Sequence, residues 1–168
     1  MSVRTSMRDL KQQTGFTLLE VLVALVVLSI GLLGHSKLQA LGVRAATDSH
    51  LRTEATFLAN DMIERMRANR PSVTSNYYAG ISYATIDCTS APAKICSEGT
   101  AGSAVDCTTT EMADEDAFNW FCEVTATLPN GSVAVSSAAG VYSVQVGWDG
   151  LDEDGLVKAW DMSATFIP

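Results

Sequence analysis

The chain has 168 residues, of which 47% are hydrophobic and 18% are charged, and its formal net charge at pH 7 is −8. A body this acidic repels phosphate backbones, so we expect no nucleic-acid partner. The length fits one ordinary domain with an additional element.

The first feature along the chain is an apolar run over 16–34, which contains a single charged residue, Glu20. A helix of this length would span about 28 Å, close to the hydrocarbon core of a bilayer at about 30 Å. Three basic residues in 1–15 precede it, so the positive-inside rule places 1–15 in the cytoplasm and the rest of the chain outside. No cleavage site of the ordinary secretory kind follows the run, so we expect the cell to retain it.

An acid in a membrane-spanning helix requires a cationic partner, and no Lys or Arg lies within one helical turn of Glu20. Cleavage after Gly15 would create an amino group on Phe16, four residues and one helical turn before Glu20. The amine of a neighbouring subunit could reach Glu20 equally well. Such a pair in apolar surroundings would fix the register in which subunits stack.

The segment Gly15–Gly34, GFTLLEVLVALVVLSIGLLG, closely resembles the class III leader junction of type IV pilins and pseudopilins. The resemblance implies that prepilin peptidase cuts after Gly15 and N-methylates Phe16, and that Glu20 is required for filament assembly. It also implies partners: other minor and major pilins and the inner-membrane assembly machinery. The expected location is the bacterial inner membrane, held by 16–34 with a periplasmic head, and afterwards an extracellular pilus.

The helical pattern continues beyond the membrane run to about Asn69, where Pro71 stops it. Such a helix is too long for a compact domain. We therefore expect a cleaved leader at 1–15, a transmembrane and stalk helix over 16–50, and a head over 51–168 whose spine is the helix end 51–70. One apolar stripe marks the core face of this spine: Leu51, Ala55, Leu58, Met62 and Met66.

The stretch Ala55–Pro71, ATFLANDMIERMRANRP, resembles the end of the N-terminal helix in PilV-type minor pilins. Major pilins usually carry a proline in the outer half of the transmembrane segment, and 30–34 has none. The resemblance implies a minor subunit that helps to initiate a pilus for twitching motility and adhesion. Two alternatives stay open: a minor pseudopilin of type II secretion, and an anchored adhesin-like head that binds a ligand through 71–106.

All four cysteines lie in the expected head, and none forms a CxxC pair. Their spacing does not fit a metal site, whereas an even number in loop-rich sequence predicts two disulfides and an oxidising compartment. Four cysteines allow three pairings, and all three stay open. The residues are Cys88, Cys96, Cys107 and Cys122.

The head begins with a long connecting region, the αβ-loop over 71–106, in which we expect one short strand near 81–86. The residues Thr108–Glu111 form a capping-box pattern and predict a second helix over about 109–127. A strand from Asn119 competes with this helix, because the sequence there also alternates. The helical interpretation gives one apolar face: Ala113, Ala117, Trp120, Val124 and Leu128.

Three strands should follow, over about 132–137, 141–148 and 156–167, and the loop 149–155 should join the last two as a hairpin. An antiparallel sheet of these strands, packed on the stripe of the long helix, would bury both apolar faces. The predicted fold class is therefore α+β, with the architecture of a type IV pilin.

No motif in the sequence predicts catalysis or metal binding. The acidic loop 149–155, DGLDEDG, lacks the spacing of an EF-hand, so a solvated acidic turn is favoured over calcium binding, which stays open. The chain has no nucleophile–base motif and no phosphate-binding loop. We expect no enzyme, no catalytic residue, no cofactor and no metal.

Overall fold

The computed structural model describes residues 15–96, 106–152 and 155–168. It divides into two compact units, 1–43 and 44–168, and we describe each by itself. The long helix α1, Leu18–Ala68, contributes to both units.

In the second unit α1 buries one face. The buried residues recur at helical spacing and include the predicted stripe from Ala55 onward, while Leu51 is half-buried. The helix stops at Ala68 because Pro71 cannot donate a backbone hydrogen bond to a continuing helix. The buried set is Ala55, Leu58, Ala59, Met62, Ile63 and Met66.

The connecting region forms three short helical segments and no strand within its described residues. These are α2, Arg70–Thr74, α3, Tyr77–Gly80, and the 3₁₀ turn η1, Tyr83–Thr85. The strand predicted near 81–86 is therefore wrong. Instead of pairing with a sheet, this segment buries Tyr83, as α3 buries Tyr78, and the ring of Tyr83 contacts that of Trp120 edge-on at 5.7 Å between ring centres.

The second helix, α4, spans Thr109–Thr127, as the capping box predicted. The hydroxyl of Thr108 accepts a hydrogen bond from Glu111 N at 3.2 Å, and the Glu111 carboxylate accepts one from Thr108 N at 2.7 Å. The two reciprocal bonds satisfy donors that every helix start leaves unpaired. The competing strand from Asn119 is excluded, and the predicted apolar face of α4 is buried.

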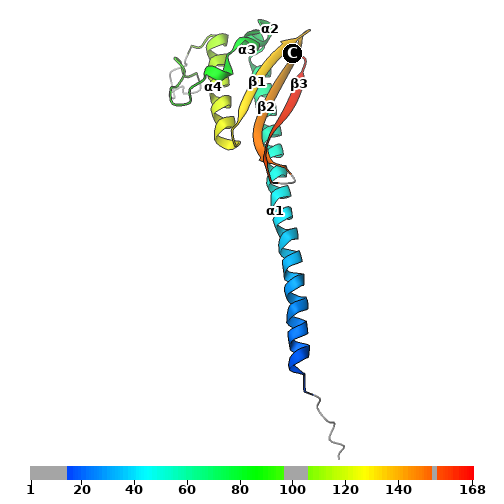
Figure 1. The fold of residues 1–168 in the computed structure, drawn as a ribbon. Helices are drawn as coiled ribbons and strands as arrows, with labels where there is room; N and C mark the ends of the chain where they lie inside the picture. The colour runs from blue at the N-terminus through cyan, green and yellow to red at the C-terminus, as the bar shows by residue number, and fades with distance from the viewer. Residues whose placement is uncertain (1–14, 97–105, 153–154) are drawn as a thin grey trace, which may run out of the picture. The chain divides into compact units, whose positions relative to one another are not determined.

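The three strands form one antiparallel sheet in the order β1-β2-β3 (Figure 1). They are β1, Ser132–Ala138, β2, Val141–Leu151, and β3, Val157–Phe166. The second strand is longer than predicted, because the pairing continues to Leu151 opposite Val157. The expected loop 149–155 is correspondingly shorter, and its residues 153 and 154 lie outside the described residues.

The core lies where α1, α4 and the sheet meet. The indole of Trp120 donates a hydrogen bond of 2.8 Å to the carbonyl of Leu58 and so joins α4 to α1. On the other side, the guanidinium of Arg52 on α1 lies 4.5 Å from the ring of Trp160 on β3. The fold class is thus the predicted one: a long N-terminal helix packed on a three-stranded antiparallel sheet.

Candidate assembly and processing site

The predicted processing residues lie just before α1. Gly15, Phe16 and Thr17 are not helical, and the side chain of Phe16 is 83% exposed. The hydroxyl and the carbonyl of Thr17 both accept hydrogen bonds from Glu20 N, at 3.2 and 3.1 Å. Thr17 thereby caps the helix start. The pattern Thr-x-x-Glu over Thr17–Glu20 is readable in the sequence, and our sequence interpretation missed it.

Phe16 and Glu20 border the same shallow groove of about 450 Å³ on the side of α1. In the uncut chain Phe16 precedes the helix, whereas the spacing argument concerns the amine that cleavage would create, so the approach of that amine to Glu20 stays a prediction. The carboxylate of Glu20 has no hydrogen-bond or ion-pair partner among the described residues. Its place in the first turn suits the positive end of the helix dipole. The remaining lining is apolar: Val21, Ala24, Leu25 and Leu28.

The helix beyond this start is exposed and apolar. Its most apolar window of 18 residues has a mean hydropathy of 2.3, and none of that window is buried. Among the described helices it alone is long and apolar enough to cross a membrane. The hydroxyls of Ser29 and Ser36 donate to the carbonyls of Leu25 and Leu32, at 2.7 and 2.9 Å. These polar groups are satisfied within the helix, as an apolar environment requires.

The four cysteines form two disulfides, which confirms the predicted number and selects one pairing of the three. Cys88–Cys122 attaches the αβ-loop to α4, and Cys96–Cys107 closes a shorter loop within the segment between Cys88 and Cys122. The Cα atoms are 5.6 and 6.0 Å apart, within the range that disulfides require.

Polar contacts fasten the same loop to the start of α4. The backbone N of Cys96 donates a hydrogen bond of 2.7 Å to the carboxylate of Glu115, which is buried. The ammonium of Lys94 lies 3.2 Å from the Glu111 carboxylate and also donates to the carbonyl of Asp106. Glu115 thus binds a loop residue that lies 19 positions earlier in the chain.

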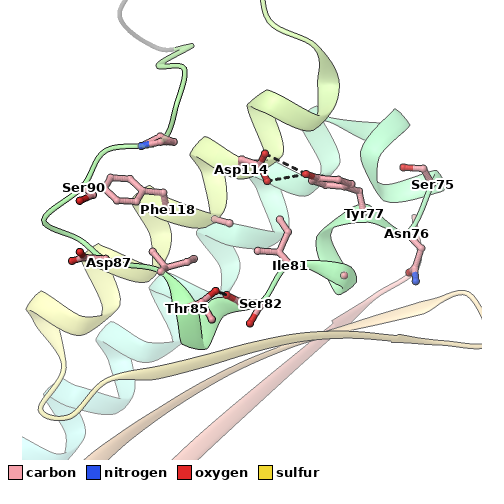
Figure 2. Close-up of a pocket in the computed structure, with 14 residues that line it drawn as sticks. Ser75, Asn76, Tyr77, Ile81, Ser82, Thr85, Asp87, Ser90, Asp114 and Phe118 are labelled. Carbon is pink, nitrogen blue, oxygen red and sulfur yellow. Dashed lines mark hydrogen bonds between the residues drawn. The ribbon is translucent and has the colours of Figure 1, made fainter.

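A groove of about 610 Å³ lies between α4 and the helical segments of the αβ-loop (Figure 2). Five side chains with hydroxyl groups line it, beside two acids, Asp87 and Asp114. The Tyr77 hydroxyl donates to both oxygens of Asp114, at 3.0 and 3.2 Å, and the ring of Phe118 forms part of the wall (Figure 2). Within the described residues, no group of three His, Cys, Asp or Glu side chains is placed to hold a metal ion.

The geometry defines an anchored subunit: an exposed apolar helix with a lone acid at its start, followed by a disulfide-bonded α+β head. Two family models match this chain. One, described as a prokaryotic N-terminal methylation motif, covers residues 10–34, and the other, type IV pilin Tt1218, covers residues 37–118. The searches of curated proteins and of solved structures found no match.

The chain belongs to the type IV pilins, and its residues 37–118 are similar to the Tt1218-like members. Its role is therefore that of a pilin subunit. The family is a structural one, and its members generally assemble with other pilins and are processed by prepilin peptidase.

Proposed function

We propose that this chain is a minor pilin of the PilV type that helps to initiate a type IV pilus used for motility and adhesion. In this proposal prepilin peptidase removes 1–15 and N-methylates Phe16. The observation that carries the proposal is Glu20, a carboxylate without a partner among the described residues, at the start of an exposed apolar helix inside the methylation motif.

The head would face the periplasm before assembly, because the basic residues of the leader favour the cytoplasm. After cleavage frees the α-amino group of Phe16, this amine, or the amine of a neighbouring subunit, supplies the positive charge that Glu20 lacks. In the groove that both residues border, the surroundings are apolar, so the attraction between the charges is weakly screened. Assembly would then transfer the helix from lipid into a bundle of like helices and keep its apolar surface out of water.

Processing is tested by the intact mass and N-terminal sequence of the protein from membranes of cells with and without prepilin peptidase. We expect loss of 1–15 and a methylated Phe16 only when the enzyme is present. An intact leader in both strains would contradict processing and, with it, the assembly role of Glu20.

The role of Glu20 is tested by Glu20→Gln, which keeps the shape of the side chain and removes its charge. The matched control is Glu54→Gln, a half-buried acid further along the same helix. We expect Glu20→Gln to be cleaved normally and to be absent from sheared pili, whereas Glu54→Gln should enter them. Equal incorporation of the two variants would contradict the proposal.

A second candidate is the anchored binding head, and the groove of Figure 2 supports it because hydroxyl groups and acids converge there. That function predicts that Glu20→Gln cells still adhere, while Phe118→Ser cells do not. The pseudopilin alternative predicts a defect in protein secretion, with pili unaffected, when the gene is deleted.

A further inference from the structure

The groove of Figure 2 presents mainly hydrogen-bond acceptors. Its volume of about 610 Å³ lies within the range of small-molecule sites. The carboxylates of Asp87 and Asp114 line it, and an ionised carboxylate can only accept hydrogen bonds. Within the described part of the chain, no Lys, Arg or His side chain lines the groove. A ligand must therefore bring donors, and the two acids disfavour a ligand with negative charge.

Three of the five hydroxyl groups in the groove add further acceptors. A hydroxyl has one proton, and those of Ser75, Tyr77 and Thr85 are donated within the protein. Ser75 and Thr85 donate to backbone carbonyls, at 3.1 and 2.8 Å, and Tyr77 donates to Asp114. The oxygens of these three hydroxyls keep lone pairs that can accept from a ligand.

Asp87 also keeps acceptor capacity. Its Oδ1 accepts two hydrogen bonds from Thr89, one from the backbone N at 2.9 Å and one from the hydroxyl at 2.8 Å. These bonds lower the pKa of Asp87 below its ordinary value, so the carboxylate is ionised at neutral pH. Its Oδ2 has no hydrogen-bond partner among the described residues and can accept from a ligand.

The other two hydroxyls of the groove can both donate and accept. Those of Ser82 and Ser90 make no hydrogen bond with any residue that the structure describes. A ligand that fills the groove must therefore also offer acceptors to these two protons. An ammonium group offers only donors and would leave them unmatched. A sugar hydroxyl both donates and accepts, so a polyhydroxylated ligand matches the whole set.

The groove also has an aromatic wall. Phe118 lies four residues after Asp114 on α4, so the ring and the carboxylate share one face of the helix. The side chain of Phe118 is half-buried, and Figure 2 shows its ring among the residues of the groove. Ile81 and Ile86 add half-buried apolar surface. The C–H face of a sugar ring can pack on an aromatic ring while its hydroxyls reach the polar groups around it.

We propose that this groove binds an uncharged carbohydrate, with Phe118 packed against a sugar ring and with Asp87 and Asp114 accepting hydrogen bonds from its hydroxyls. The inference rests on the binding-head function given above as the second candidate and specifies its ligand class. It does not require assembly into a filament. A free saccharide and a glycan on a cell surface present the same hydroxyls, and the test separates these two sources.

The test is saturation-transfer NMR of saccharides mixed with the full-length purified chain. The detergent must have no sugar headgroup, because such a headgroup would compete for the groove. The uncharged probes are maltotriose, cellotriose, chitotriose and lactose, each at up to about 10 mM, which fills even a site with a Kd of about 1 mM. The matched acidic probe is trigalacturonate, and the ammonium probe is acetyl-lysine methylamide. We expect a signal from at least one uncharged saccharide and none from the two charged probes.

Three variants locate the binding. Asp87→Asn keeps the shape of the side chain and removes its charge, and it should weaken binding about tenfold, because hydrogen bonds to charged groups are the stronger ones. Phe118→Leu keeps an apolar side chain but loses the ring, and it should weaken binding by a similar factor, whereas Phe118→Tyr should bind like the parent. The matched control is Asp161→Asn, an exposed acid on β3 outside the groove, which should not change binding.

The absence of a signal from every uncharged saccharide would overturn the proposal. So would a stronger signal from either charged probe, or equal binding by the parent, Asp87→Asn and Phe118→Leu.

Cells that carry Phe118→Ser separate this inference from the binding-head function. If they lose adhesion although the purified chain binds no saccharide, the binding head stands and its carbohydrate ligand is excluded. If they adhere normally although the purified chain binds a saccharide, the site stands for a free saccharide and the adhesive role fails. Loss of both in the variant supports a glycan on a cell surface.

Discussion

The hydroxyl of Tyr78 donates a hydrogen bond of 2.7 Å to Oδ2 of Asp116, and this bond joins α3 to α4 in the interior of the head. Arg65 approaches the other oxygen of the carboxylate at 3.6 Å, and Asn69 donates to the hydroxyl of Tyr78 at 3.2 Å. Burial raises the pKa of Asp116 above its ordinary value, although the hydrogen bond from Tyr78 and the charge of Arg65 act against that rise.

Replacing Tyr78 by phenylalanine should destabilise the head by about 1–3 kcal/mol, because the partly buried carboxylate of Asp116 loses a hydrogen bond from a hydroxyl in the core. The matched control is Tyr77→Phe, since the hydroxyl of Tyr77 also binds a carboxylate, that of Asp114, but at an exposed position. We expect the control to cost less than about 1 kcal/mol. The measurement is the free energy of unfolding by denaturant for the full-length chain in detergent. Equal losses in the two variants would contradict the importance of burial.

At alkaline pH the head should lose stability through two tyrosines. Burial raises the pKa of Tyr78 and that of Tyr83 well above the ordinary 10.0, and the nearby Asp116 carboxylate adds to both shifts. Above pH 10 the unfolded chain therefore releases protons that the folded chain retains, and the free energy of unfolding falls as pH rises from there towards the raised values.

This alkaline loss is measured by tyrosinate absorbance and circular dichroism on the same sample. The last tyrosines to ionise should do so only as the helical signal disappears. The variant Tyr83→Phe should lose less stability per pH unit above 10 than the parent. Complete ionisation near pH 10 with the fold intact would show that these hydroxyls are not protected.

The two disulfides should contribute unequally. In the chain-entropy description, a bond that closes a longer loop restricts the unfolded chain more. Cys88–Cys122 spans 34 residues and Cys96–Cys107 spans 11. Replacing each pair by serine should therefore cost about 4 and about 3 kcal/mol, respectively. Unfolding of the two double variants under oxidising conditions measures the difference, and the reverse order would indicate that native contacts of the inner loop outweigh loop closure.

The turn between β1 and β2 offers a stabilising substitution. Ala139 and Gly140 both have positive φ, 52° and 79°, as a two-residue hairpin turn requires. A side chain with a Cβ is strained there, so Ala139→Gly should raise the free energy of unfolding by roughly 1 kcal/mol. Thermal unfolding measures the gain. As a control, Ala138→Gly, one residue earlier in β1, should be destabilising.

The sequence predicted correctly those elements whose determinants lie within one short segment of the chain. The capping box at Thr108 and the apolar period of α4 lie within one segment, so both could be read before the fold was known. The Gly15–Glu20 junction is likewise a contiguous motif. The helical segments of the αβ-loop were missed because Tyr78 and Tyr83 pack against α4, which follows them in the chain. The buried role of Glu115 and the disulfide pairing depend on the same long-range packing, and no local pattern encodes them.

The disulfide connectivity also restricts how the head can mature. The bond Cys96–Cys107 lies entirely within the loop closed by Cys88–Cys122, so the bonds are nested. A chain that is oxidised in the order in which its cysteines leave a membrane would first join Cys88 to Cys96, which is not a native pair. Reaching the native pattern from there requires thiol–disulfide exchange. The yield of correctly folded subunits is then set by the cell's capacity to rearrange disulfides as well as by its capacity to form them.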